Sequence, residues 1–243
     1  VPALEAVILG TTDSELRGDA AKSLTQGYVE TGAPEKIFRL LKILSAKGSR
    51  ARTDVEFNLN LLSSADKMMS EGKHGLALYM YQLVLPTDAL LEKCKGAREE
   101  MLAVRERMIK ERAPFKRILA VTERIDALEA QERTIAEAEP YTVELKLRVA
   151  KAFFEMSCRW EALWAYARIW EEHSDSPLSE QALSSAFSLA GELVLLDRAI
   201  AFGEAYLEKF PEGESKDVIG LELGKAYTAA GQSQKAIDRK SVV

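Results

Sequence analysis

The sequence predicts an all-α protein in which antiparallel helix pairs stack into a solenoid. Ala, Leu and Glu supply 92 of the 243 residues, whereas Gly and Pro together supply 21. The first three are strong helix formers, and a β-sandwich or barrel would need many more turn residues. Small residues also recur at a fixed interval in the second half of the chain, which is typical of stacked helical repeats.

Composition excludes several classes of protein. The net charge is −5 with 29% charged residues, which argues against a disordered acidic tail and a general nucleic-acid binder. No apolar run approaches the roughly 18 residues needed to span a bilayer. The two cysteines, Cys94 and Cys158, form neither a disulfide framework nor a C-x-x-C pair. We therefore expect no nucleic-acid partner and no direct membrane span.

Three alanines mark the repeat in the C-terminal part of the chain. Ala162, Ala199 and Ala236 follow one another at intervals of 37 residues. The last copy reads Leu223-Gly224-x-x-Tyr227, then Gly231 and Ala236. This pattern resembles the tetratricopeptide repeat, in which small residues let two antiparallel helices pack closely and aromatic side chains fill the space between repeats.

The resemblance implies the architecture of both ends of the chain. Residues 141–243 are expected to form repeats of about 37 residues, with the last one cut short at Val243, so that further repeats or a cap would follow in a longer product. A weaker copy spans Gly72–Ala77, followed by Tyr81. A still weaker copy has Ile37 in place of the small residue. Residues 1–87 are therefore expected to form helix pairs of the same kind.

Residues 88–140 interrupt the repeats and predict an inserted helical hairpin. Apolar residues recur there at alternating spacings of four and three, as in a helix–helix seam. Pro114 divides the segment, since proline disfavours the α conformation in the residue before it. We expect antiparallel helices over 88–112 and 115–138, each roughly 37 Å long. A straight dimeric coiled coil is the alternative, and an interior proline costing about 3 kcal/mol argues against it. The predicted seam contains Leu90, Met101, Val104, Ile125 and Leu128, with Glu132 interrupting it.

No pattern in the sequence predicts catalysis. The only histidines are His74 and His173, and neither has a second histidine nearby. Glu71 lies three residues before His74, but a single pair of this kind is common by chance. The acidic pairs Glu99-Glu100 and Glu171-Glu172 lie in charged stretches, which favours solvated helix faces over acid–base chemistry. No phosphate-binding glycine loop is present. We therefore expect no enzyme activity, no catalytic residue, no cofactor and no metal site.

Aromatic residues concentrate between positions 153 and 170. Trp160 and Trp164 are four residues apart and thus share a helix face. We expect this face to lie beside Ala162 and to pack between repeats rather than to bind a ligand. Phe154 is predicted to point away from Phe153 and to face the groove of the solenoid.

The resemblance also implies a binding surface, because the first helices of such repeats line a concave groove. Some members of the family clamp a C-terminal carboxylate with asparagines from successive repeats, but Asn58 and Asn60 stand close together in one repeat. That clamp is therefore not expected. Apolar anchors among charges suit an extended or helical peptide. The predicted groove residues are Leu147, Lys151, Phe154, Glu155, Ser188, Glu192, Leu221 and Lys225, together with Ser184 and Thr228.

Two functions fit these features. The first is a non-catalytic scaffold that binds a protein segment in the groove. The alternative is a structural subunit of a larger assembly that uses the hairpin and the solenoid ends, through which a homo-oligomer is also possible. The longer inter-repeat loops resemble those of bacterial envelope members of the family. This resemblance implies the periplasm or cell envelope rather than the cytoplasm.

Overall fold

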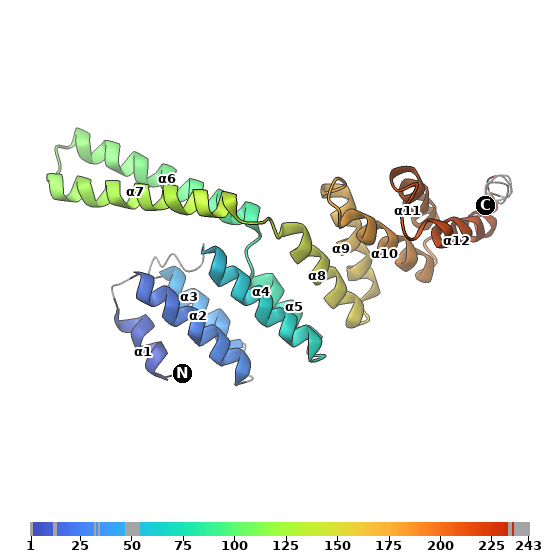
Figure 1. The fold of residues 1–243 in the computed structure, drawn as a ribbon, viewed down its shortest axis with the longest axis horizontal. Coiled ribbons are helices and arrows are strands. Elements are labelled where there is room, and N and C mark those ends of the chain that lie inside the picture. The colour runs from blue at the N-terminus through green and yellow to red at the C-terminus, as the bar shows by residue number, and fades with distance from the viewer. Residues whose placement is uncertain are drawn as a thin grey trace. The chain divides into compact units, whose positions relative to one another are not determined.

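The computed structural model describes residues 2–11, 14–31, 33, 35–46, 54–232 and 235, and every regular element among them is an α-helix (Figure 1). The predicted all-α class is therefore confirmed. The chain divides into two compact units, Val1–Thr142 and Val143–Val243. The predicted division into three segments stays a prediction. The helices are α1 (Pro2–Gly10), α2 (Ser14–Glu30), α3 (Glu35–Ala46), α4 (Val55–Ser70), α5 (His74–Leu83), α6 (Thr87–Lys110), α7 (Phe115–Glu137), α8 (Thr142–Glu155), α9 (Arg159–Glu172), α10 (Ser179–Glu192), α11 (Leu196–Lys209) and α12 (Lys216–Ala229).

The first unit begins with helices that pack on their neighbours in sequence. Helix α1 packs on α2, α2 contacts both α3 and α4, and α4 packs on α5. Ala77, the predicted small residue of α5, is buried, and the buried Tyr81 donates a hydrogen bond to Asp66 of α4 at 2.7 Å. The buried Asn58 accepts a hydrogen bond from the backbone N–H of Leu85 at 2.8 Å. Asn58 therefore fastens α4 to the chain that follows α5 instead of facing a ligand.

Helices α6 and α7 form the antiparallel hairpin that the apolar spacing predicts. Their bounds differ from the predicted ones by at most two residues, and Pro114 lies immediately before α7. Met101 and Val104 of the seam are only half-buried. Towards the base of the hairpin, where the chain enters α6 and leaves α7, the seam is buried at Leu90, Cys94, Ile125, Leu128 and Ile135.

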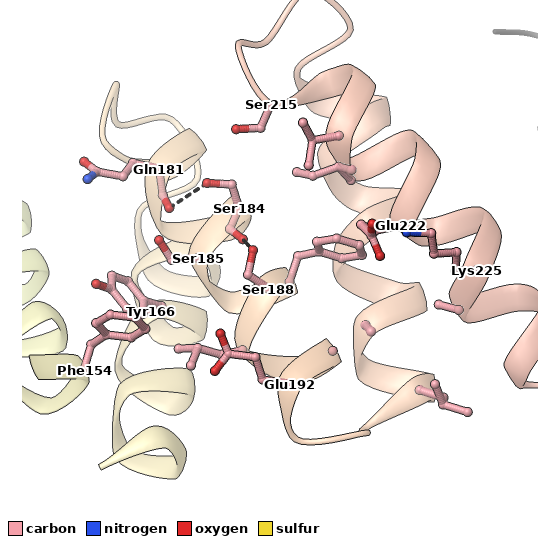
Figure 2. Close-up of a pocket in the computed structure, with 18 of the residues that line it drawn as sticks. Phe154, Tyr166, Gln181, Ser184, Ser185, Ser188, Glu192, Ser215, Glu222 and Lys225 are labelled. Carbon is pink, nitrogen blue, oxygen red and sulfur yellow. Dashed lines mark hydrogen bonds and ion pairs between the residues drawn. The ribbon is translucent and has the colours of Figure 1, made fainter. Parts of the chain in front are cut away.

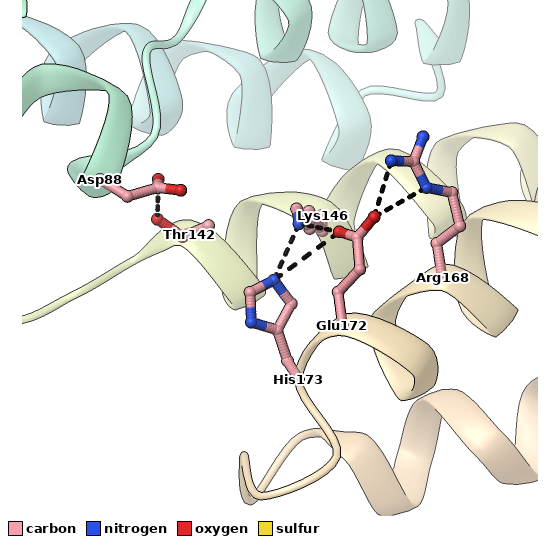
Figure 3. Close-up of polar contacts among 6 residues, drawn as sticks. All are labelled: Asp88, Thr142, Lys146, Arg168, Glu172 and His173. Carbon is pink, nitrogen blue, oxygen red and sulfur yellow. Dashed lines mark hydrogen bonds and ion pairs between the residues drawn. The ribbon is translucent and has the colours of Figure 1, made fainter. Parts of the chain in front are cut away.

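Polar contacts complete the hairpin. Glu132 interrupts the apolar seam because it accepts a hydrogen bond from Nε of Arg98 on the facing helix at 2.7 Å. At the base, the backbone N–H of Tyr141 donates to Oγ1 of Thr87 at 3.1 Å. The Tyr141 hydroxyl donates to the carbonyl oxygen of Leu85 at 2.8 Å. Thr142 similarly donates to Asp88 at 2.8 Å (Figure 3). These bonds hold the two ends of the hairpin together.

The second unit repeats with a strict period. Helices α8, α10 and α12 begin at Thr142, Ser179 and Lys216, and α9 and α11 begin at Arg159 and Leu196, so that each element recurs after 37 residues. Successive helices from α9 to α12 pack on one another. Their core consists of small and aromatic side chains, as the repeat pattern predicts.

Close helix packing explains the alanines of this unit. Ala162 and Ala199 are 0% and 2% exposed, which confirms the predicted burial; Ala236 lies outside the described residues. On α11, a Cβ atom added to Gly203 would lie 2.9 Å from the Phe187 ring of α10. No side chain fits at that distance without a shift of the ring.

The loop between α11 and α12, residues 210–215, is anchored to the helices beside it. The buried Tyr206 donates a hydrogen bond to Glu180 at 2.5 Å and accepts one from the backbone N–H of Ser215 at 3.0 Å. Glu180 also accepts from the backbone N–H of Glu214 at 2.9 Å. The loop is thus held to α10 and α11 by a tyrosine–glutamate pair.

The prediction that Trp160 and Trp164 pack between repeats is wrong. They are 50% and 45% exposed, and the guanidinium of Arg198 lies 4.9 Å from the centre of the Trp164 ring. Each helical residue turns by about 100°, so side chains two positions from Ala162 point to the opposite side of α9. Because Ala162 faces the core, both tryptophans lie on the opposite, exposed face of α9.

Candidate partner-binding groove

A groove of about 790 Å³ lies in the second unit, with residues of α8, α10 and α12 along it (Figure 2). These are the first helices of successive repeats, the helices that the resemblance assigns to the binding surface. The structure brings six of the eight predicted residues to this groove, and their role in binding stays a prediction. They are Lys151, Phe154, Glu155, Ser188, Glu192 and Lys225, and Ser184 joins them.

Arg159 holds the Phe154 side chain in place. Arg159, at the start of α9, stacks its guanidinium 4.2 Å from the centre of the Phe154 ring and donates a hydrogen bond to the Phe154 carbonyl oxygen at 2.8 Å. The same guanidinium lies 3.4 Å from a carboxylate oxygen of Glu192 at the end of α10. The ring is half-buried and lines the groove, so it is both oriented and accessible.

Serines of α10 form the middle of the groove. The Ser184 hydroxyl donates to the carbonyl oxygen of Gln181 at 3.0 Å, and the Ser188 hydroxyl donates to that of Ser184 at 3.1 Å. Each proton is used within the helix, so each oxygen faces the groove as an acceptor. Short side chains also keep this part of the groove hollow.

Helix α12 contributes charge and an apolar side chain to the other wall. Lys225 lies 2.6 Å from Glu222 in an exposed ion pair, and Val218 is exposed beside them on the same helix. Across the groove on α8, Lys151 is exposed and forms no ion pair within the described part of the chain. The groove therefore offers one unpaired cation.

Tyr166 of α9 closes the groove behind Phe154. It is buried, and this burial raises the pKa of its hydroxyl. The phenol therefore stays neutral across the physiological range. It adds a polar group to the groove without adding charge.

Three predicted residues do not line the groove. Leu147 packs against the core of the second unit, and Leu221 and Thr228 are exposed on α12. Val218 and Glu222 of α12 line the groove instead. Leu147 and Leu221 hold equivalent positions, two repeats apart, and that position misses the groove on both walls. Thr228 is equivalent to Phe154, and it misses the groove because α12 turns a different flank towards it than α8 does. The four-residue spacing of Val218 and Glu222 is the signal that could have identified the second flank.

A second groove, of about 430 Å³, lies between α2 and α4 in the first unit. Its lining includes Lys22, Gln26, Asn60 and Ser64, and every residue around it is polar or charged. Lys22 forms an ion pair with Glu56. This groove thus contains hydrogen-bonding groups but no apolar anchor.

The two histidines and Glu172 have structural contacts. Nδ1 of His74 lies 3.4 Å from the Met69 sulfur. His173 ends α9, and its Nε2 lies 2.8 Å from Nζ of Lys146. Glu172 accepts from both Lys146 and Arg168 (Figure 3), and these bonds lower its pKa to about 2. Glu172 is exposed, as the sequence predicted for the acidic pairs, and it belongs to an ion-pair cluster that joins α8 to α9.

The described residues also lack the arrangements that metal binding and membrane insertion require. Those residues contain no group of three or more His, Cys, Asp or Glu side chains arranged to hold a metal ion. Among the same residues, no helix combines the length and the apolar character needed to cross a bilayer.

Comparison with known proteins gives likenesses to solved structures alone. No family model and no curated protein matches the sequence. Among solved structures, the TPR domain of P58(IPK) is similar over 92% of this chain, with 22% sequence identity and a TM-score of 0.32. The match covers 57% of that domain's chain, so this chain spans a little over half of it.

Proposed function

We propose that the second unit is a non-catalytic protein-interaction module that holds an extended or helical protein segment in the groove along α8, α10 and α12. The observation that carries this proposal is an oriented, accessible Phe154 next to the unpaired Lys151. Aromatic anchors dominate binding energy in protein interfaces. A ring already fixed by Arg159 loses little conformational entropy on binding.

The chemistry of the groove describes the segment that would fit. Phe154 and Val218 provide apolar contacts on opposite walls. Lys151 lies within a turn of Phe154 and is free to pair with a carboxylate. Serine oxygens between the walls accept hydrogen bonds from amide or hydroxyl groups. We therefore propose a segment in which an apolar side chain lies close to Asp or Glu.

The test begins with capture of a partner from the native source and its identification by mass spectrometry. Affinity is then measured for the wild type, Phe154→Ala and Lys151→Glu, with folding checked by circular dichroism. We expect each variant to weaken binding by at least tenfold, or about 1.4 kcal/mol. The matched controls are Phe115→Ala and Lys209→Glu, which alter an exposed phenylalanine and an exposed lysine outside the groove. Full-strength binding by the folded groove variants would refute the proposal.

A second candidate function is a structural subunit of a larger assembly. The specific observation in its favour is the exposure of Trp160 and Trp164 on one face of α9, since large exposed aromatics often mark interfaces. This function predicts that Trp160→Ser releases the chain from a complex or a homo-oligomer in light scattering, while Phe154→Ala does not. The bacterial envelope location belongs to the same proposal, and cell fractionation tests it.

A further inference from the structure

The turn between α6 and α7 exposes apolar side chains. Phe115, the first residue of α7, is 77% exposed, more than any other large apolar side chain in the described part of the chain. Ile109 and Leu119 are 55% and 44% exposed on either side of the turn. The helix–helix seam of the hairpin uses other residues, so internal packing does not explain these three.

Charge is divided unequally along the hairpin. Residues 105–118 contain six basic and two acidic residues, a net charge of +4, whereas the rest of residues 87–140 contains five basic and ten acidic residues, a net charge of −5. Five of the cations near the turn are exposed, and none of them forms an ion pair within the described residues, unlike Arg98 nearer the base. These five are Arg107, Lys110, Arg112, Lys116 and Arg117.

Helix stability explains only part of this charge. Arg107 and Lys110 lie in the last turn of α6, where cations favour the helix dipole. Lys116 and Arg117 lie in the first turn of α7, where cations oppose it. That turn contains no acidic residue, and no side chain caps the helix. Lys116 and Arg117 therefore weaken the helix that carries them, which points to a role outside the fold.

We propose that this tip, formed by the three apolar residues and the five cations, docks on the surface of an anionic membrane. Lys and Arg pair with anionic headgroups, and apolar side chains enter the boundary between headgroups and acyl chains. A hairpin turn is convex and so suits a planar partner, whereas both grooves described above lie on other helices. A partner that offers only phosphates, such as a nucleic acid, would leave Phe115, Ile109 and Leu119 without a role.

The test is co-sedimentation of the full chain with vesicles. Vesicles of phosphatidylcholine mixed with phosphatidylserine are compared with vesicles of phosphatidylcholine alone. We expect binding only to the anionic vesicles, and weaker binding as salt rises. The double variant Lys116→Glu with Arg117→Glu is expected to lower the partition coefficient by about tenfold or more. Its melting temperature should not fall, because acidic residues favour the start of a helix. Phe115→Ser is expected to lower partitioning several-fold.

The matched control is Lys93→Glu with Lys95→Glu, which makes the same change in net charge at exposed positions nearer the base of α6. It is expected to bind like the wild type. Equal loss of binding in both double variants would overturn the proposal, since binding would then follow net charge alone. Unchanged binding by Phe115→Ser would overturn it too. So would a wild type that ignores anionic vesicles but binds soluble polyglutamate, because the occupant would then be an acidic protein.

Discussion

The grooves of the two units differ in side-chain chemistry although both lie along first helices of successive helix pairs. In the first unit, the groove between α2 and α4 is lined by polar residues, and its Lys22 is paired with Glu56. In the second unit, the groove contains Phe154, Val218 and the unpaired Lys151. The first groove contains no apolar anchor, although its Lys67, like Lys151, forms no ion pair among the described residues, whereas the second groove places an apolar anchor beside its unpaired cation. Helix-pair architecture supplies a groove, and a few side chains decide whether the groove can bind.

The units also differ at the position where paired helices approach most closely. Ala162 and Ala199 occupy it in the second unit, and Ala77 occupies it in α5 of the first. In α3 the same position holds the fully buried Ile37. The α2–α3 pair of the first unit therefore accepts a large side chain where the other helix pairs have only a methyl group.

Enlarging the small residue should give the largest effect on stability. We expect Ala199→Leu to lower the free energy of unfolding by roughly 1–3 kcal/mol, because α10 and α11 leave no space for the longer side chain. Urea denaturation measures the change, and hydrogen exchange should rise in α10–α12 but not in α4 and α5. Ala201→Leu, at an exposed position of the same helix, is the control. An unchanged urea midpoint for Ala199→Leu would contradict the assigned repeat register.

Exchanging residues in the turn between paired helices sharpens the comparison of the units. Gly72 follows α4 with φ +74°, and Val194 follows α10 with φ 58°. The left-handed region is costly for a β-branched residue and natural for glycine. We expect Gly72→Val to destabilise by about 1–2 kcal/mol and Val194→Gly to stabilise by up to about 1 kcal/mol.

Thermal denaturation of both turn variants measures these changes. Ser157→Gly, at the equivalent turn of α8 with φ 60°, is the control and should change stability less than Val194→Gly does. A loss of stability in Val194→Gly would show that the exposed valine contributes contacts that outweigh its backbone strain.

Periodic features of the fold were predictable from the sequence because they depend on residues close in the chain. The 37-residue spacing predicted the helix pairs of the second unit, and the spacing of Leu90, Ile125 and their neighbours predicted the hairpin. Contacts between distant residues were not predictable in this way. The Tyr206–Glu180 pair that anchors the loop and the Asn58–Leu85 hydrogen bond join residues 26 and 27 positions apart.

The candidate site was predicted where the side-chain direction follows from the repeat alone. This was true of Ser188 in the middle of the groove and of Phe154 on its wall. It failed for Thr228 of α12, the equivalent of Phe154, since the helix at the far wall turns another flank inward. The exposed tryptophans of α9 show the same limitation, because a spacing of two residues from Ala162 reverses the direction of a helical side chain.

Lowering the pH should weaken the ion-pair cluster around Glu172 in the second unit. We expect this to be the smallest of the effects on stability. Hydrogen bonds from Lys146 and Arg168 lower the pKa of Glu172 to about 2. A carboxylate with a lowered pKa stabilises the fold above its unfolded pKa, near 4.5, and this contribution is lost as the pH falls towards 2. Because the side chain is 37% exposed, solvent screening limits the contribution to less than about 1 kcal/mol.

Comparison with Glu172→Gln tests this contribution. The variant should be slightly less stable than the wild type at neutral pH, and the difference should disappear near pH 2 in urea titrations. Glu171→Gln alters the exposed neighbouring acid and should follow the wild type throughout. A difference between Glu172→Gln and the wild type that grows as the pH falls would contradict the assignment.

The hydrogen bonds at the base of the hairpin make this part of the molecule tolerant of changes in length. Tyr141 and Thr142 hold the departing chain against residues 85–88, so the hairpin begins and ends at one place. The entropy of closing such a loop grows only with the logarithm of its length, and a doubling costs about 0.6 kcal/mol. Adding or removing one heptad in each arm would therefore move the tip by roughly 10 Å while the base stays closed. The reach of the hairpin can vary independently of the helices that support it.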